Sequence, residues 1–280
     1  MDARYFDAHC HVQFDSYDAD REALIERMRE RGVAGIVVGV DLESSKQAVA
    51  LAERYEHLYV SVGLHPNREP NESFDAAEYR TLATHPKVVA IGECGLDYYR
   101  PAQVDEELKR KQQELLKQQI ALAVELDKPL IIHSRPSKGT QDAYQDLIAI
   151  LKEPLLSNDR TKTGIPGAKR LRGDIHFFVG GVEEMRKLVA LGFTVSFTAV
   201  ITFARDYDEV IRATPLESIL AETDAPYVPP TNRARGSRND PFAVEDVVAK
   251  LSLIRGEDLE TVRQATLANS QRLFGLPSPL

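Results

Sequence analysis

The stretch Asp7-Ala8-His9-Cys10-His11 decides how the fold is interpreted, because it ends a short apolar run near the amino terminus. This run predicts a first β-strand over residues 5–11. Side chains two residues apart on a strand point to the same face, so His9 and His11 should project together, with Cys10 on the other side. Two imidazoles on one face suit a transition-metal site. An isolated His-x-His pair also arises by chance on surface loops, so this interpretation depends on the other strands.

A regular alternation of strands and helices runs along the rest of the chain. Apolar, β-branched segments predict eight strands, at 5–11, 35–41, 58–65, 88–97, 130–135, 175–179, 194–198 and 219–224. Amphipathic segments predict helices at 21–31, 46–55, 75–84, 105–126, 142–151, 183–191 and 207–213, with two closing helices at 242–255 and 259–274. Eight strand–helix units over 280 residues favour the α/β class, as a single-domain (β/α)₈ TIM barrel spanning 1–280.

A doubly wound open sheet is the alternative fold, and it is disfavoured because no glycine-rich phosphate loop follows the first strand. No linker or internal repeat divides the chain. The segment 152–173 is basic and long for a connection. It lies between a helix and the next strand, which places it on the barrel face opposite the usual site. We interpret it as a solvated insertion, with a nucleic-acid-binding arm as the alternative.

Composition and charge narrow the class of protein. Hydrophobic residues make up 43% of the chain and charged residues 28%, which is ordinary for a soluble globular protein. There is no membrane-spanning run and no signal-peptide core, and the two cysteines are too few for a disulfide framework, so we expect a cytoplasmic protein. The net charge of −8 argues against broad, non-specific DNA binding, although it allows a local basic patch.

The predicted strand ends carry a set of imidazoles and carboxylates. In a barrel of this kind, function is found at the carboxyl ends of the strands. The groups at or near these ends are His9, His11, His65, Glu93, Asp97, His133, His176, Glu222 and Asp224. Burying several such groups without a cation would cost several kcal/mol in unpaired polar groups. The economical arrangement is two metal ions bridged by a carboxylate. The other two histidines, His57 and His85, are expected to face solvent.

Six motifs, in order, resemble the TatD family of metal-dependent hydrolases, which belongs to the amidohydrolase superfamily. They are Asp7-Ala8-His9-Cys10-His11, Gly63-Leu64-His65-Pro66, Ile91-Gly92-Glu93-Cys94-Gly95-Leu96-Asp97, Ile132-His133-Ser134-Arg135, His176-Phe177-Phe178-Val179-Gly180 and Glu222-Thr223-Asp224-Ala225-Pro226-Tyr227. The resemblance continues to the closing residues 269–274 and covers nearly the whole chain. It implies a TIM barrel with a divalent-metal site and deoxyribonuclease activity, often 3′ to 5′ exonucleolytic.

The resemblance also implies the metal ligands. His9, His11, Glu93 and Asp224 match one metal's ligands. Glu93, His133 and His176 match the second's, with Glu93 as the bridge. By ligand softness the site favours Zn, Mn or Ni over Mg, although metal supply in the cell can override affinity.

This chain departs from the family pattern at two places. After the sixth-strand histidine it has Phe177-Phe178-Val179-Gly180 in place of the usual Cys-Phe-Ser-Gly. Asn67 stands where a second histidine or an aromatic residue often follows the His-Pro pair. Both departures concern substrate contacts more than metal ligands.

The expected chemistry is phosphodiester hydrolysis by metal-activated water. Asp224 is the expected general base, and Glu222, pointing the same way, is expected to orient substrate or a second water. His65 could donate to a phosphate oxygen or serve in packing, and both roles stay open. Arg135 shares the face of His133. Arginines of the loop after the last strand, expected to hold phosphate, are Arg233, Arg235 and Arg238.

The expected substrate is DNA, single-stranded or at 3′ ends, with no membrane and no obligatory protein partner. Three alternatives remain. The chain could act on a small amide, lactone or phosphoester, or on an aminoacyl-RNA ester. It could also be an inactive metal-binding scaffold, which the complete set of carboxylates disfavours. Cys10 and Cys94 alternate with ligands and should face the helices as inert small apolar residues.

Overall fold

The computed structural model describes residues 3–67, 73–101, 104–156, 171–234 and 236–278, without the side chains of 154–156. Eight parallel strands form one sheet in sequence order. They are β1 (Tyr5–Cys10), β2 (Val33–Val38), β3 (Leu58–Val62), β4 (Val88–Asp97), β5 (Leu130–Arg135), β6 (Gly173–His176), β7 (Phe193–Phe197) and β8 (Ile219–Ala221). A parallel bridge between Cys10 and Ala225 brings the last strand's end back to the first. The predicted TIM barrel is therefore confirmed.

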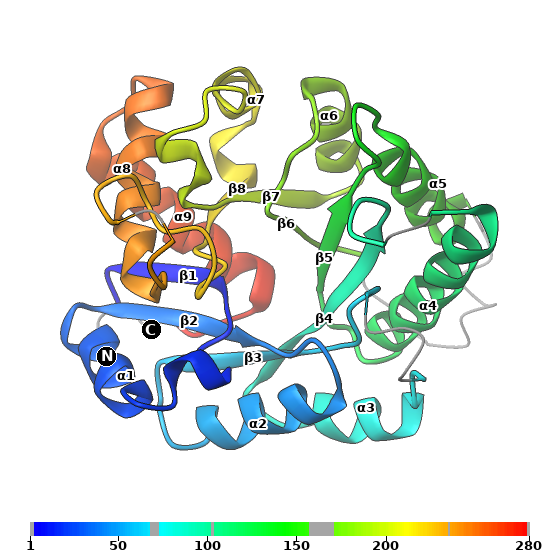
Figure 1. Ribbon diagram of the computed structural model, residues 1–280, viewed down its shortest axis with the longest axis horizontal. Coiled ribbons are helices and arrows are strands. Elements are labelled where there is room, and N and C mark those ends of the chain that lie inside the picture. The colour runs from blue at the N-terminus through cyan, green and yellow to red at the C-terminus, as the bar shows by residue number, and fades with distance from the viewer. Residues whose placement is uncertain (1–2, 68–72, 102–103, 157–170, 235, 279–280) are drawn as a thin grey trace.

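Nine helices of the described residues surround this sheet (Figure 1). They are α1 (Arg21–Glu30), α2 (Leu42–Ala52), α3 (Ala76–Ala83), α4 (Glu106–Glu125), α5 (Asp142–Leu156), α6 (Val182–Ala190), α7 (Asp208–Ala213), α8 (Val244–Arg255) and α9 (Leu259–Phe274). Aspartates begin several of them by accepting backbone N–H groups, as the side chain of Asp105 does from Leu108 and that of Asp258 from Thr261. Gly275 ends α9 in the left-handed conformation that glycine adopts without strain.

The core forms on both sides of the sheet wall. A large apolar cluster packs one face of the strands against the surrounding helices. A smaller cluster joins side chains of β1, β2, β4, β5 and β8 to Leu273 and Phe274 at the end of α9. Parallel strands that are covered in this way are apolar along their length, as the buried sequence of β2 shows.

The strand bounds differ from prediction mainly at the carboxyl ends. β4 and β5 have the predicted bounds, whereas β1, β3 and β8 end before His11, His65 and Asp224. These three residues lie in the first turns after their strands, where the chain leaves the sheet. In a regular β-strand, each side chain points either into the barrel or toward the helices. In the loops after the strands, the backbone can turn a side chain toward the middle of the barrel mouth.

The structure also tests the predictions for the segment 152–173, for His57 and for His85. The segment 152–173 begins as the last turns of α5, and 157–170 lie outside the described residues. His57 is buried rather than solvent-facing, and its Nε2 lies 3.3 Å from the carbonyl oxygen of Ile25. His85 is partly exposed and pairs with Glu53. No helix among the described residues is long and apolar enough to cross a membrane.

Candidate metal centre

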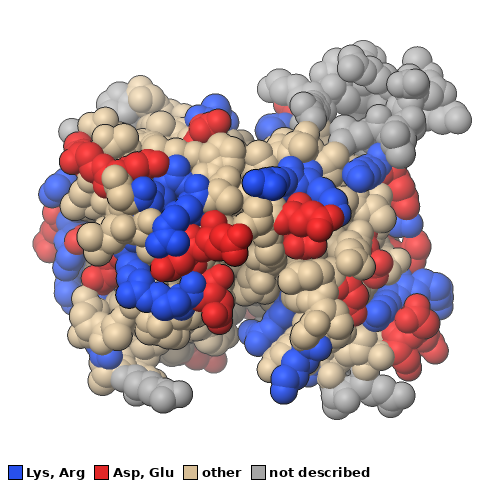
Figure 2. Space-filling model, turned by 90° about the horizontal axis from the view of Figure 1, so that it is seen from above, with Lys and Arg blue, Asp and Glu red and all other residues tan. Residues whose placement is uncertain are grey.

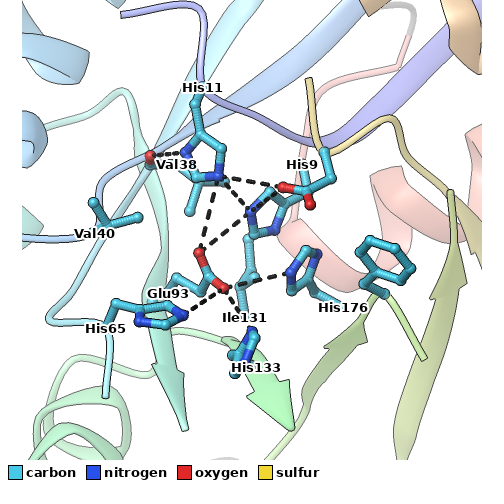
Figure 3. Close-up of polar contacts among 12 residues, drawn as sticks. His9, His11, Val38, Val40, His65, Glu93, Ile131, His133 and His176 are labelled. Atoms are coloured by element: carbon cyan, nitrogen blue, oxygen red, sulfur yellow. Dashed lines mark hydrogen bonds and ion pairs between the residues drawn. The ribbon is translucent and has the colours of Figure 1, made fainter. Parts of the chain in front are cut away.

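Glu93 lies at the centre of five buried histidines at the carboxyl ends of the strands (Figure 3). They are His9 and His11 from the end of β1, His65 from the loop after β3, His133 of β5 and His176 of β6. Glu93 itself comes from the middle of β4. Barrel closure thus brings together residues that are more than 160 positions apart in the sequence.

One carboxylate oxygen of Glu93 faces the first donor set. Its Oε2 lies 3.5 Å from His9 Nε2 and 4.0 Å from His11 Nε2. Asp224 Oδ1 lies 3.9 Å and 3.5 Å from the same two nitrogens. The two histidine nitrogens are 3.2 Å apart. Four donor atoms from three strand ends therefore converge.

The other oxygen of Glu93 faces a second donor set. Its Oε1 lies 3.1 Å from His133 Nδ1 and 3.4 Å from His176 Nε2. His65 Nε2 is also 3.4 Å from this oxygen. Glu93 is thus the shared member of both sets, as expected for a bridging carboxylate.

Hydrogen bonds on the far side of the rings decide which nitrogen offers a lone pair. His11 Nδ1 lies 2.8 Å from the carbonyl oxygen of Val38. His176 Nδ1 lies 2.9 Å from Glu222, and His133 Nε2 lies 3.2 Å from Asp97. Each of these acceptors requires the ring nitrogen beside it to carry the proton. The other nitrogen of each ring, which faces Glu93, is then free to bind a cation.

His65 has the opposite arrangement. Its Nδ1 accepts a hydrogen bond of 3.1 Å from the backbone N–H of Asn67. The neutral ring therefore carries its proton on Nε2, the atom that faces Glu93. His65 is placed as a hydrogen-bond donor rather than as a metal ligand. This arrangement favours the donor role over a purely packing role.

The donor atoms fit divalent metal ions. Bonds of about 2.1 Å in tetrahedral geometry put neighbouring ligand atoms about 3.4 Å apart. The separations within the first set run from 3.2 to 4.0 Å. His9 Nδ1 is buried and has no hydrogen-bond partner among the described residues, and Glu222 Oε2 lies 3.8 Å from it. Imidazole and carboxylate together suit Zn, Mn or Ni.

The electrostatics of the centre favour ionised carboxylates. Burial by itself raises the pKa of Glu93, but the surrounding histidines outweigh burial and hold this pKa well below its ordinary value. For Asp224, burial is likewise outweighed by the neighbouring imidazoles of His11, His176 and His9, so the pKa of Asp224 is lowered. Both groups are anions at neutral pH.

Asp224 owes its position to an unusual backbone conformation. Its φ of 51° lies in the left-handed region, which aspartate tolerates better than most residues. The backbone N–H of Asp224 donates to the carbonyl oxygen of His9 at 2.9 Å. Behind it, Asp7 accepts hydrogen bonds from the backbone and hydroxyl of Thr223. The end of β8 is thus tied to β1, where the first donor set is assembled.

A cavity of about 490 Å³ opens above the centre. It is lined by His11, Phe14, Val40, His65, Asn67, Glu93, Arg100, His133, Ser134, Arg135, His176, Phe177, Val179, Val200, Tyr207, Asp224 and Tyr227. Among the expected substrate contacts, His65 and Arg135 therefore lie in the cavity.

Three other expected contacts do not reach the cavity. Glu222 is fully buried, and its oxygens accept from the backbone N–H of Phe177 at 2.6 Å and from His176. It therefore positions His176 and has no face open to substrate. Arg233 is paired with Asp240, and Arg238 with Asp20; neither lines the cavity. Arg235 lies outside the described residues.

Residues for which the sequence predicted no role also build the site. Asp97 is fully buried and accepts from His133 Nε2 and, at 2.6 Å, from the Asn67 side-chain amide. Its even spacing from Glu93 along one strand was a usable signal, because such residues share a face. Arg100 lines the cavity and follows the same strand. The ring of Phe14 stacks on His11 with centroids 4.6 Å apart, a contact for which the sequence offered no signal.

Both cysteines are buried. Cys10 and Cys94 are both fully buried in the apolar cluster that contacts the helices, as predicted. Burial raises the pKa of both thiols.

Surface charge gives no broad binding face in the view that Figure 2 offers. Lys and Arg side chains alternate there with Asp and Glu side chains. Elsewhere among the described residues several surface charges are paired, as Arg80 is with Glu125 and Arg31 with Glu245. This face therefore offers no continuous basic surface for an anionic substrate.

Comparisons with known proteins match this chain over nearly its whole length. The family model described as TatD related DNase matches residues 6–275. A relative in Bacillus subtilis, named uncharacterized metal-dependent hydrolase YabD, is 36% identical over 96% of this chain and 98% of its own length. A relative in Klebsiella pneumoniae, named 3′-5′ ssDNA/RNA exonuclease TatD, is 33% identical over 97% of this chain and 98% of its own.

A solved structure has the same fold. The crystal structure of YjjV, a TatD homologue from Escherichia coli K12, superposes with a TM-score of 0.83. It is 32% identical and covers 99% of this chain and 100% of its own.

Proposed function

The chain belongs to the TatD-related DNase family of metal-dependent hydrolases, and from this premise we propose that it removes nucleotides from the 3′ end of single-stranded DNA. The observation that carries the proposal is the position of Glu93, whose two oxygens face two separate sets of donor atoms. Such a shared carboxylate is typical of sites that hold two divalent ions about 4 Å apart and cleave phosphodiesters. The name of the Klebsiella relative supports the substrate class.

Two divalent ions would be held by this chain's own residues. His9, His11 and Asp224 would hold one, His133 and His176 the other, and Glu93 both. Bound there, divalent ions would lower the pKa of water and neutralise charge on the phosphoryl oxygens.

The remaining groups have roles that their positions support. Asp224 is ionised and lines the cavity, so it accepts the proton of the attacking water. His65 carries its proton on the nitrogen that faces Glu93 and donates it in a hydrogen bond to a phosphate oxygen. Arg135 and Arg100 line the same cavity and neutralise the phosphates next to the cleaved bond. Glu222 and Asp97 fix the rings of His176 and His133 from behind.

A small phosphoester is the second candidate substrate. The cavity volume of about 490 Å³ is that of a small-molecule site. An amide, a lactone or an aminoacyl-RNA ester would use the same donors, but no side chain of the described residues favours them. An inactive scaffold is disfavoured because every ligand that the family resemblance implies is present in the chain.

The test is cleavage of end-labelled single-stranded DNA by protein stripped of metal and then supplied with Mn, Zn or Mg. We expect stepwise loss of nucleotides from the 3′ end. Glu93→Ala should lose activity by about a thousandfold or more, because metal ions contribute several kcal/mol to such reactions. Glu53→Ala is the matched control, since Glu53 is a surface residue paired with His85. A wild-type protein with an occupied site that cleaves small phosphoesters but no DNA would refute the nuclease proposal.

A further inference from the structure

The cavity above the metal centre has two unlike halves. The loops after β3 and β4 and the last residue of β5 supply polar or cationic lining, namely His65, Asn67, Arg100 and Arg135. Loops after β6, β7, β8, β1 and β2 supply mainly apolar lining, including Phe177, Val179, Val200, Tyr227, Phe14 and Val40. Because the strands follow one another in order around the barrel, each half is continuous. The metal centre draws its ligands from β1, β4, β5, β6 and the end of β8, so it lies between the halves.

The polar half, which carries Arg100 and Arg135, can bind a phosphate group. The guanidinium of Arg135 lies over the ring of Tyr99, 4.1 Å from its centroid, which fixes the plane of the group. Within the described part of the chain, no carboxylate lies within ion-pair distance of Arg135. Arg100 contacts Asp97 only at 3.8 Å and its side chain is about half exposed. These two guanidinium groups therefore remain available to an anion.

Several side chains of the apolar half are exposed at the cavity. Tyr227 is 48% exposed and Val179 is 36% exposed. Phe177 has a φ of 46°, a left-handed conformation that costs a non-glycine residue energy and persists only where its surroundings fix it. The bond from its N–H to the buried Glu222 carboxylate fixes it here. Apolar side chains kept exposed beside an active centre mark a binding surface.

We propose that the apolar half binds the terminal base of the strand while Arg135 and Arg100 hold the next phosphate. This inference rests on the proposed function and names the part of the substrate that each half contacts. A nucleic-acid end offers one flat apolar base and a row of phosphates, which matches the two halves in kind and in order. Stacking tolerates any base sequence, because every base has a π-face. A base that is paired in a duplex cannot stack on the apolar half. The cavity should therefore prefer strands whose 3′ end is unpaired.

The first experiment compares two strands that differ only at the 3′ terminus, one with a normal nucleotide and one with an abasic residue. For the wild type we expect a KM about tenfold higher for the abasic end, which corresponds to about 1.4 kcal/mol of lost stacking. The double variant Phe177→Cys/Val179→Ser should lose most of this difference. The single variants Val179→Ser and Val200→Ala leave Phe177, the residue beside His176, unchanged. Each should reduce the KM difference between the two strands.

Leu253→Ser is the matched control, because Leu253 is 76% exposed on α8 and lies outside the cavity. It should keep the wild-type difference. A second readout does not need catalysis: a strand ending in 2-aminopurine should lose fluorescence on binding metal-stripped protein, and less so with Val179→Ser. Equal KM values for both ends, or unchanged fluorescence, would refute the base site while leaving the nuclease intact. Absence of cleavage of either strand by the metal-loaded protein would instead refute the proposed function.

Discussion

A neutral histidine offers a lone pair from only one ring nitrogen, so the acceptor behind each ring decides what the ring can do. Behind His11, His133 and His176 that acceptor is a carbonyl or a carboxylate, and the free nitrogen faces Glu93. Behind His65 there is instead a donor, the backbone N–H of Asn67, and the tautomer is reversed. Four histidines of one cluster are therefore not chemically equivalent, although their residue type is the same.

Asp97→Asn tests this role of the acceptor. The amide keeps one oxygen, whereas Asp97 now accepts from His133, Asn67 and two backbone N–H groups. His133 should lose its fixed tautomer, and affinity for the second metal should fall by about 10–100-fold, as for other residues that orient ligands. Metal content after dialysis against dilute chelator measures this.

Asp146→Asn is the control for Asp97→Asn, since Asp146 bonds to Tyr98 and Gln113 and to none of the ligand histidines. It should retain both metals. If Asp97→Asn also retained both with wild-type affinity, Asp97 would not position His133.

At the scale of elements, the residues that stabilise the barrel and the residues that build the site lie in different parts of the fold. Strand interiors and helix faces are buried and apolar, whereas the loops after the strands carry the chemical groups. The helices that follow are begun by polar side chains that satisfy free backbone N–H groups. At the start of α5, Asp142 accepts from the backbone N–H of Ala143 in the helix, and also from the backbone and hydroxyl of Ser137 and from Lys109.

Asp142→Asn should destabilise the protein by about 1 kcal/mol at pH 7 through loss of these charge-assisted bonds. Burial alone would raise the pKa of Asp142, but the bonds from Ser137 and its neighbours lower it to about 2. A depressed folded-state pKa contributes stability above the unfolded value near pH 4, and this contribution is lost as pH falls toward 2.

Urea unfolding of wild type and Asp142→Asn at pH 7 and pH 3 measures the effect. The difference between the two proteins should be smaller at pH 3. Glu106→Gln is the control, because Glu106 is 94% exposed and lies 4.0 Å from the same Lys109; it should change stability little. A difference that grows on acidification would contradict the assigned role.

At the scale of the whole molecule, the centre joins five places in the chain and so couples metal binding to folding. A ligand that binds only the folded state stabilises it by about 2.7 kcal/mol at a concentration of 100 times its Kd. For a domain of this size that is a rise in Tm of about 5–10 °C. We expect this rise when Mn or Zn is added to stripped wild-type protein, measured by thermal unfolding. Glu93→Ala, which removes the shared ligand, should show almost none. An equal rise in both proteins would place the bound metal elsewhere.

The sequence by itself determined the barrel and the identity of the groups at its rim. Alternating apolar segments with the period of strands and helices need only local information, and the strand bounds of β4 and β5 were predicted without error. The shared face of His9 and His11, and the placement of Glu93, His133 and Asp224 in or directly after predicted strands, could be predicted for the same reason.

Only the tertiary structure decided what each group does. Glu222 turned inward to hold His176, Arg233 and Arg238 were taken up by Asp240 and Asp20, and Asp97 became the partner of His133. Each of these outcomes depends on a distance between residues from different elements, mostly far apart in the sequence. A side chain's role is set by the partner that the fold brings within about 3 Å of it, and periodicity along one strand carries no record of that partner.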